Sequence, residues 1–239
     1  MATDPSLATG WTRYSAAYPI AVERSVDQVE LGPGLPALDR RFIGDVVGSR
    51  VLDLGCGMGH GAVALARQGA KVIAVDPDAS QLAHARQLAE QHAVKVELHH
   101  ADLAELAFIR SASIDLVLSV FALAAVDDLD RVFRQVHRIL HPGAPFLLTL
   151  PHPFTTLLRE AGDGSLRVER PFSSRAPLGE GPTLTYPHQF SDIHTSLTRA
   201  NFRVDAVLEP ETDSRSPWRN AMTGWVPSTL VMRARKEGI

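Results

Sequence analysis

Seven short apolar runs, most of them separated by segments of helical periodicity, constrain the fold of this chain more than any other feature. Each run is rich in Val, Ile and Leu, and they lie at residues 50–54, 71–76, 94–100, 114–120, 145–150, 202–208 and 229–235. Such alternation is typical of parallel strands connected by crossover helices. The sequence therefore predicts an α/β fold built on a mostly parallel sheet.

The hydrophobic patterns also indicate where each strand lies in the sheet. Four runs are almost continuously apolar, as expected for strands buried on both faces: 50–54, 71–76, 114–120 and 145–150. The runs at 94–100 and 202–208 alternate apolar and polar residues, which places them nearer the edges. A Pro-rich link without a crossover helix separates the last two runs, so we expect them to be antiparallel.

Three helices are predicted between these strands. Asp78 and Gln81 have the spacing of a capping box, and the apolar residues that follow predict a helix at 79–92. A stripe of apolar residues that ends at Pro142 and Gly143 predicts a helix at 128–141. A shorter helix is expected at 61–68.

The regular alternation ends after residue 150. Residues 151–189 contain six prolines and four glycines, so they form a long connection of the kind that often serves as a lid or binding loop. The first 48 residues have no strand pattern but carry several aromatic residues, which suggests helices that cover a site. We expect one domain over 1–239 with four parts: a lid (1–48), a core (49–150), a cap (151–189), and a final helix with two strands (190–239).

Composition and charge narrow the possible partners. The net charge is −3 and the chain has no run of basic residues, which argues against nucleic acid. The longest predominantly apolar stretch, at 116–126, is too short to cross a membrane. The first fifteen residues do not resemble a secretory signal, so a cytoplasmic protein is expected. A small molecule is the expected partner, and a homodimer is left open.

The segment from Val51 to His60 carries the most functional information. Its sequence, VLDLGCGMGH, is an apolar strand that runs into three alternate glycines and then into a helix. Glycines are needed where a chain turns sharply or where a ligand contacts the main chain. Exposed amides and the positive end of the helix favour a polar or anionic group, such as a phosphate or an amino-acid carboxylate.

Two kinds of ligand fit this turn. Gly57 to Ala62 also matches the dinucleotide pattern, and Asp76 stands at a suitable distance for a ribose. Asp53, however, precedes Gly55 by two residues, where it would repel a diphosphate but could hold an α-ammonium group. Asp102, after the third strand, is suited to accept a hydrogen bond from an adenine amino group. These acids favour a cofactor with an ammonium group over a nicotinamide dinucleotide.

Residues 48–150 resemble the class I S-adenosylmethionine-dependent methyltransferases. The matching segments are VLDLGCGMG at 51–59, VIAVD at 72–76, ADL at 101–103, IDLVLS at 114–119 and LHPG at 140–143. The resemblance implies a Rossmann-like, mostly parallel sheet of seven strands, with an antiparallel last strand and helices on both faces. Together with the helices expected in the first 48 residues, this gives a domain with an N-terminal helical lid.

The resemblance also implies S-adenosylmethionine as the cofactor, S-adenosylhomocysteine as its product, and a set of binding residues. The glycines and Cys56 would contact the methionine part of the cofactor, and Asp76 would bind the ribose hydroxyls. Asp102 and Leu103 would contact the adenine. Residues at the end of the fourth strand would lie near the sulfonium. The set is Asp53, Gly55, Cys56, Gly57, Gly59, Asp76, Pro77, Asp102, Leu103, Ser119 and Phe121. Ser119 stands where the family often has Asn or Asp, so we assign it no catalytic role.

Methyl transfer from a sulfonium is an in-line displacement that depends mainly on alignment and exclusion of water. His152 and His188 are the candidate general bases, because histidine titrates near neutral pH. The candidate acceptor contacts are aromatic: Trp11, Tyr14, Tyr18 and Tyr186.

No metal is expected, since the adjacent His99 and His100 would point to opposite faces of a strand. Two alternatives to a methyltransferase stay open at this stage. They are a protein that binds S-adenosylmethionine without catalysis and a nicotinamide-dependent oxidoreductase.

Overall fold

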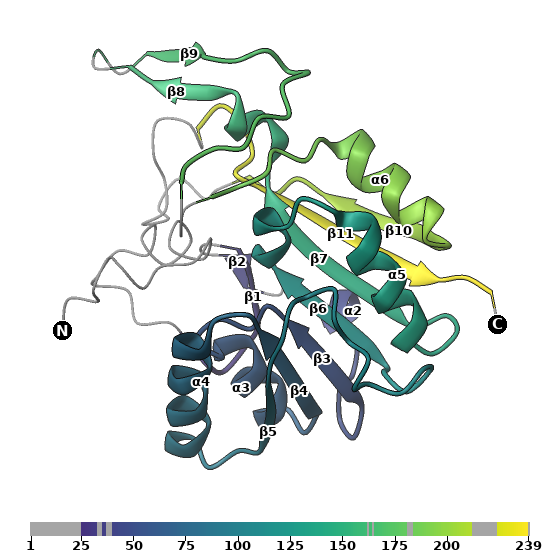
Figure 1. Ribbon diagram of the computed structural model, residues 1–239. Coiled ribbons are helices and arrows are strands. Elements are labelled where there is room, and N and C mark those ends of the chain that lie inside the picture. The colour runs from purple at the N-terminus through teal and green to yellow at the C-terminus, as the bar shows by residue number, and fades with distance from the viewer. Residues whose placement is uncertain are drawn as a thin grey trace.

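A sheet of seven strands organises the protein (Figure 1). The computed structural model describes residues 25–32, 35–36, 40–161, 163, 165–180, 184–211 and 224–238. The strands of the sheet are β3 (Arg50–Leu54), β4 (Lys71–Asp76), β5 (Val96–His100), β6 (Leu116–Val120), β7 (Pro145–Pro151), β10 (Phe202–Leu208) and β11 (Thr229–Lys236). Their order is β10-β11-β7-β6-β3-β4-β5.

The strand directions confirm the predicted fold class. β11 is antiparallel to both of its neighbours, β10 and β7. All other adjoining pairs are parallel. β5 and β10, whose sequences alternate, occupy the two edges, and the almost continuously apolar β3 and β6 lie inside the sheet. The distribution of apolar residues therefore predicts both the sheet and the position of its edges.

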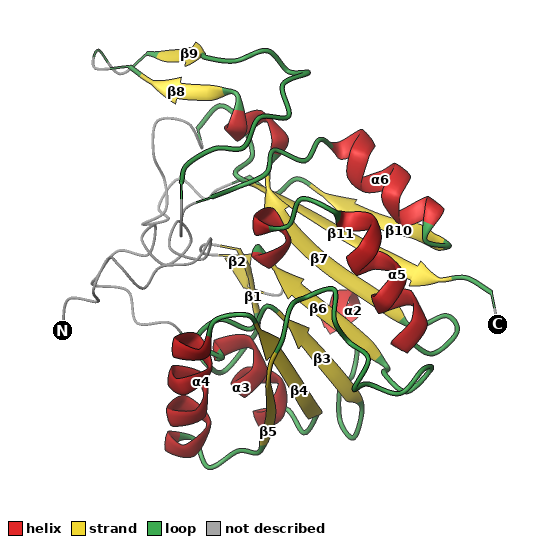
Figure 2. Cartoon of the chain, viewed as in Figure 1, coloured by secondary structure: helices red, strands yellow, loops and turns green. Residues whose placement is uncertain are grey.

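Helices cover both faces of the sheet (Figure 2). The four main helices are α3 (His60–Arg67), α4 (Ala79–Gln91), α5 (Leu129–Ile139) and α6 (Phe190–Arg199). Val51 packs in one apolar cluster with residues of α3 and α4, whereas Leu52 packs in another with residues of α5 and α6. Successive residues of β3 thus point to opposite helical layers, as the pleat of a strand requires.

Two of these helices, α4 and α5, begin at an aspartate whose side chain accepts a hydrogen bond from a main-chain amide. Asp78 accepts from Ser80 N at 2.7 Å at the start of α4, and Asp128 accepts from Arg131 N at 3.1 Å at the start of α5. Such caps stabilise a helix by satisfying donors that have no partner within it. Both predicted helix starts are confirmed.

The N-terminal segment differs from the expectation. Residues 1–24, 33–34 and 37–39 of the expected helical lid lie outside the described residues, but the rest includes two short strands, β1 (Glu30–Gly32) and β2 (Leu35–Pro36). The prediction that residues 1–48 contain no strand was therefore wrong. The strand β1 forms because Val29 and Leu31, each 1% exposed, pack in the same cluster as Val51. A single turn of helix, α2 (Arg40–Ile43), follows.

The long connection after β7 contains some regular structure. The 3-10 helix η3 (Pro153–Thr156) leads into a hairpin of β8 (Leu158–Glu160) and β9 (Leu166–Val168), which projects beyond the sheet in Figure 1. The last residues of the long connection contact η2 (Ala122–Ala125), a 3-10 helix that follows β6. There Tyr186 N donates a hydrogen bond to Ala124 O at 2.8 Å. Within the described ranges, no helix has the length and apolar character needed to span a membrane.

Candidate functional site

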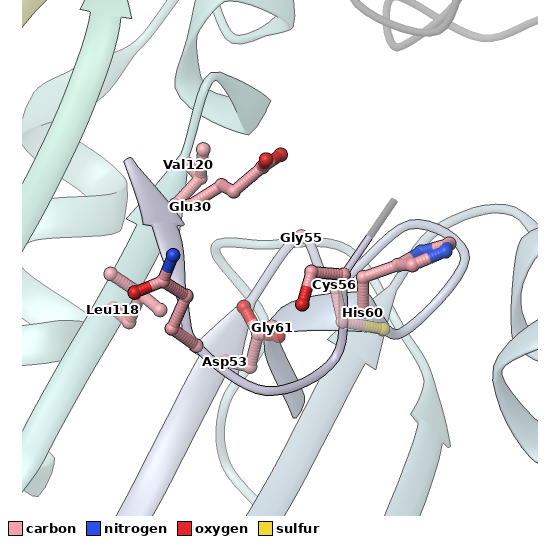
Figure 3. Close-up of a pocket in the computed structure, with 10 residues that line it drawn as sticks. Glu30, Asp53, Gly55, Cys56, His60, Gly61, Leu118 and Val120 are labelled. Carbon is pink, nitrogen blue, oxygen red and sulfur yellow. The ribbon is translucent and has the colours of Figure 1, made fainter. Parts of the chain in front are cut away.

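The strand order reverses between β3 and β6, and a pocket lies at their carboxyl ends. The chain passes from β3 to β4 on one side and places β6 on the other, which makes this the point where ligands bind in open α/β sheets. The pocket is lined by Ser25, Gln28, Glu30, Asp53, Gly55, Cys56, His60, Gly61, Leu118 and Val120 (Figure 3). β3, β6, the glycine turn, α3 and the segment around β1 therefore all contribute to its walls.

Hydrogen bonds fix the glycine turn to the end of β4. The amides of Gly55 and Cys56 both donate to Val75 O, at 2.8 and 3.0 Å. The amide of Gly57 donates to Asp76 Oδ2 at 2.8 Å. These bonds join the carboxyl ends of two adjacent strands, so the protein's own main chain and Asp76 hold the turn in place.

The glycines at 55 and 59 are required by the protein's own packing. Both have a left-handed backbone, with φ of 79° and 85°, which disfavours other residues. A Cβ on Gly55 would overlap the Cβ of Ala122, and one on Gly59 would lie 2.6 Å from the Cβ of Ala85. At these two positions the absence of a side chain is therefore explained by the turn conformation and by alanines of η2 and α4, which occupy the space that a Cβ would take.

Asp76 is a buried carboxylate at the end of β4. It is 1% exposed, and its Oδ1 accepts from Asp78 N at 2.9 Å while Oδ2 accepts from Gly57 N. Burial raises the pKa of Asp76, and the two amide bonds oppose that effect. The next residue, Pro77, accepts a hydrogen bond from the His100 ring through its carbonyl oxygen, at 2.9 Å. Further donors directed at Asp76 would favour its charged form.

Asp53 lies beneath the first turn of α3. A Cβ on Gly61 would be 3.1 Å from Asp53 Oδ2, so the glycine makes room for the carboxylate. The neighbouring Cys56 is buried, and burial raises the pKa of its thiol well above the usual value, with Asp53 and Asp76 adding to the effect. The thiol is therefore protonated at neutral pH and unsuited to act as a nucleophile.

Asp102 and Leu103 follow β5, next to the end of β4. Asp76 pairs with His100 in the sheet, and Ala101 N donates to Asp76 O at 3.3 Å. Asp102 is exposed and its Oδ1 accepts from Ala104 N at 2.7 Å, whereas Leu103 is buried. The fold thus places Asp102 next to Asp76, at the carboxyl ends of the parallel strands.

Ser119 and Phe121 lie at the end of β6. The hydroxyl of Ser119 is fully buried and donates to Leu54 O at 2.8 Å, which ties β6 to β3. Phe121 has φ of 61°, an uncommon conformation for a bulky residue, and its amide donates to Thr149 O at 3.0 Å. Strained residues of this kind are concentrated at functional sites.

Neither candidate base lines the pocket of Figure 3. The ring of His152 is buried between two partners, since Nδ1 accepts from Phe154 N at 3.2 Å and Nε2 donates to Glu209 at 3.0 Å. His188 donates from Nε2 to Val126 O at 2.6 Å. Burial lowers the pKa of His188, so its ring is neutral at pH 7 and Nδ1 is the basic nitrogen.

The aromatic acceptor contacts are described only in part. Trp11, Tyr14 and Tyr18 lie outside the described residues. The ring of Tyr186 is partly buried and stacks on His188, with 6.4 Å between the ring centroids. This stacking brings one candidate aromatic contact and one candidate base together at η2.

The sequence did not identify Ser25, Gln28 or Glu30 as pocket residues. A signal was present, because Val29, Glu30 and Leu31 alternate apolar and polar residues ahead of a Gly-Pro-Gly turn. A strand of three residues gives too short a pattern to be distinguished from a loop.

A glycine turn beside Asp53, with Asp76 and Asp102 at the two adjacent strand ends, defines a class of site. Doubly wound α/β proteins bind ligands at this position, and acids placed there favour a ligand with hydroxyl, amino and ammonium groups over a diphosphate.

Comparison with known proteins defines this class more narrowly. Residues 51–143 match the family model described as a methyltransferase domain. The chain is 33% identical to a probable S-adenosylmethionine-dependent methyltransferase of Mycolicibacterium smegmatis, over 45% of this chain and 40% of that relative. It is also 33% identical to a ubiquinone biosynthesis O-methyltransferase of Xanthomonas oryzae pv. oryzae, over 74% of this chain and 70% of the relative.

A solved structure supports the same assignment. An S-adenosylmethionine-dependent methyltransferase from Mesorhizobium loti is 25% identical and superposes with a TM-score of 0.69, covering 82% of this chain and 95% of that one. The protein belongs to the class I S-adenosylmethionine-dependent methyltransferase family, and S-adenosylmethionine is its cofactor.

Proposed function

We propose that this protein transfers the methyl group of S-adenosylmethionine to a hydroxyl oxygen of a small, partly apolar molecule. The observation that carries the proposal is the extent of the match to the Xanthomonas O-methyltransferase. That match covers 74% of the chain, whereas the methyltransferase domain covers residues 51–143 alone. The similarity therefore includes sequence outside the cofactor-binding core, where an acceptor would be recognised.

The cofactor is proposed to lie across the ends of four strands. Its methionine part contacts the turn of Gly55, Cys56, Gly57 and Gly59, and Asp53 faces the α-ammonium group. Asp76 accepts from the ribose hydroxyls, supported by its burial and by its position beside the turn. Asp102 and the Leu103 amide meet the adenine, while Ser119 and Phe121 lie near the sulfonium.

The acceptor is proposed to bind between the cofactor and residues 151–189. The chain has no basic run, which favours a small acceptor over nucleic acid. Of the two histidines, His188 is the better supported base, because its Nδ1 is basic while both nitrogens of His152 have partners. A neutral hydroxyl gains from such a base, whereas a thiol or amine depends on it less.

A panel of acceptors tests this function. Phenols, amines and thiols with one shared carbon skeleton are incubated with S-adenosylmethionine, and S-adenosylhomocysteine is measured. We expect turnover of a phenol and a fall of about tenfold or more in kcat for His188→Gln. Because the pKa of His188 is lowered, wild-type activity should decline only below about pH 6.5, the ordinary histidine value. Turnover of the amine or thiol alone would contradict oxygen as the acceptor atom.

A further inference from the structure

Glu30 lies in the cofactor pocket although it belongs to no methyltransferase motif. Leu31 of β1 and Val29, the residue before this strand, are buried against the sheet, so the intervening Glu30 points the other way. Figure 3 shows Glu30 beside Val120 on one side of the pocket, with Cys56 and His60 on the other. Glu30 therefore faces the glycine turn from a separate segment of the chain.

The lining of this pocket is acidic. Asp53 and Glu30 both contribute carboxyl groups, and the described lining contains no Lys or Arg. Burial raises the pKa of Glu30, because a charged carboxylate is less favourable away from water. A cation brought between two carboxylates offsets that cost, whereas an anion increases it. Cys56 and His60 are the other lining side chains that carry titratable groups.

We infer that Glu30 is a second carboxylate for the α-ammonium group of the cofactor, which it holds from the side opposite Asp53. The inference rests on the cofactor placement proposed above. An ammonium group has three donors, so it can serve two carboxylates at once. Glu30 thereby selects ligands that carry the amino acid and makes β1 part of the cofactor site.

Binding of two nucleosides tests this role. S-adenosylhomocysteine carries the ammonium group, and 5′-methylthioadenosine has the same adenosine and sulfur but no amino acid. For Glu30→Gln we expect a dissociation constant about tenfold or more higher for S-adenosylhomocysteine, since charged hydrogen bonds are the strong ones. The value for 5′-methylthioadenosine should stay within about twofold. Retained binding of the second ligand shows that the variant is folded.

Two further variants complete the design. Glu30→Asp keeps the charge and should recover part of the lost affinity. Glu97→Gln is the matched control, because Glu97 is exposed on the edge strand β5, where it binds His99. This variant should not change the dissociation constant of either ligand.

The possible outcomes are distinct. An equal loss for both ligands would mean that Glu30 supports the pocket generally, and no loss for either would remove it from the site. A lower kcat with unchanged S-adenosylhomocysteine binding would assign Glu30 to the acceptor, and each of these three results overturns the inference. If the wild type failed to bind S-adenosylhomocysteine, the cofactor placement itself would be wrong.

Discussion

Asp76 has a structural and a proposed binding role in one side chain. It holds the amides of Gly57 and Asp78, and so fixes the turn that follows β3 against the end of β4. Its burial raises its pKa, because the carboxylate is removed from water with two amide donors. Ribose hydroxyls would supply two further donors. The cofactor is therefore expected to add hydrogen bonds to a carboxylate that already accepts two from main-chain amides.

Replacement of Asp76 measures this contribution. We expect Asp76→Ala to weaken S-adenosylhomocysteine binding by about 1–3 kcal/mol, because hydroxyls buried without an acceptor are costly. Isothermal titration calorimetry gives the dissociation constant. Asp128→Ala is the control, since it removes the cap of α5 and Asp128 does not line the pocket; it should lower the free energy of unfolding by about 1 kcal/mol with no effect on binding. An unchanged constant for Asp76→Ala would refute the ribose assignment.

The glycines show how far single residues can be understood from sequence. Their spacing after an apolar strand predicts a tight turn at a ligand site, and the turn is there. The sequence alone could not show why glycine is needed at positions 55 and 59. Ala122 and Ala85, which leave no room for a side chain there, are distant in sequence, and only the fold brings them close to these glycines. Glu30 was missed for the same reason.

The edge pair β10 and β11 contains an irregularity that creates an ion pair. The register shifts between Val204 and Ala206, so Asp205 lies at a bulge. Its two oxygens accept from Arg233 at 2.8 Å and from Arg235 at 2.6 Å. Burial alone would raise the pKa of Asp205, but the two arginines outweigh it and hold the pKa below its ordinary value.

This ion pair gives a stability that depends on pH. A carboxyl whose pKa is lowered by folding stabilises the protein above its unfolded pKa and loses that effect as pH falls through the folded value. We expect Asp205→Asn to lower the free energy of unfolding by about 2–3 kcal/mol at pH 7, because two partly buried arginines each lose a carboxylate partner. Near pH 3 the difference should shrink.

Urea denaturation at pH 7 and at pH 3 measures the difference in free energy of unfolding between the wild type and Asp205→Asn. Glu105→Gln, which removes an exposed pair with Arg131, should change stability by less than about 1 kcal/mol. An effect of Asp205→Asn that was the same at pH 7 and pH 3 would show that the charge of Asp205 is not its cause.

Element boundaries followed the sequence closely where a strand is long and buried. β3, β4 and β10 begin and end at the residues that the apolar runs indicate. The short hairpins were missed, because two or three residues cannot show a period. Both hairpins contain a turn signal in the sequence: Gly32 to Gly34 between β1 and β2, and Asp163 with Gly164 between β8 and β9. Turn residues are therefore the better guide to such elements.

The whole molecule places a nucleoside site at the point where the strand order reverses. That arrangement is shared by nucleoside cofactors of different chemistry, so the fold alone does not exclude a nicotinamide dinucleotide. The acids around the glycine turn make the distinction, because a diphosphate would lie against Asp53. The fold could be predicted from periodicity, whereas the choice of ligand depends on a few charges.

A thermal shift comparison tests the choice of ligand. At 100 times its dissociation constant, S-adenosylhomocysteine should stabilise the protein by about 2.7 kcal/mol, which corresponds to a rise in Tm of about 5 °C or more for a chain of this size. NADH at the same concentration should leave Tm unchanged. A rise with NADH and none with S-adenosylhomocysteine would be incompatible with the cofactor assignment.

The strand order has a consequence for how the sheet is completed. In the sheet β10 pairs with β11 alone, and β11 comes later in the chain. Residues 202–208 therefore emerge from the ribosome before the strand that connects them to β7 exists. A chain cut before Thr229 would leave β10 without its pairing strand and the main-chain donors and acceptors on one side of β7 without partners. Assembly of this edge must wait for the last segment to be synthesised.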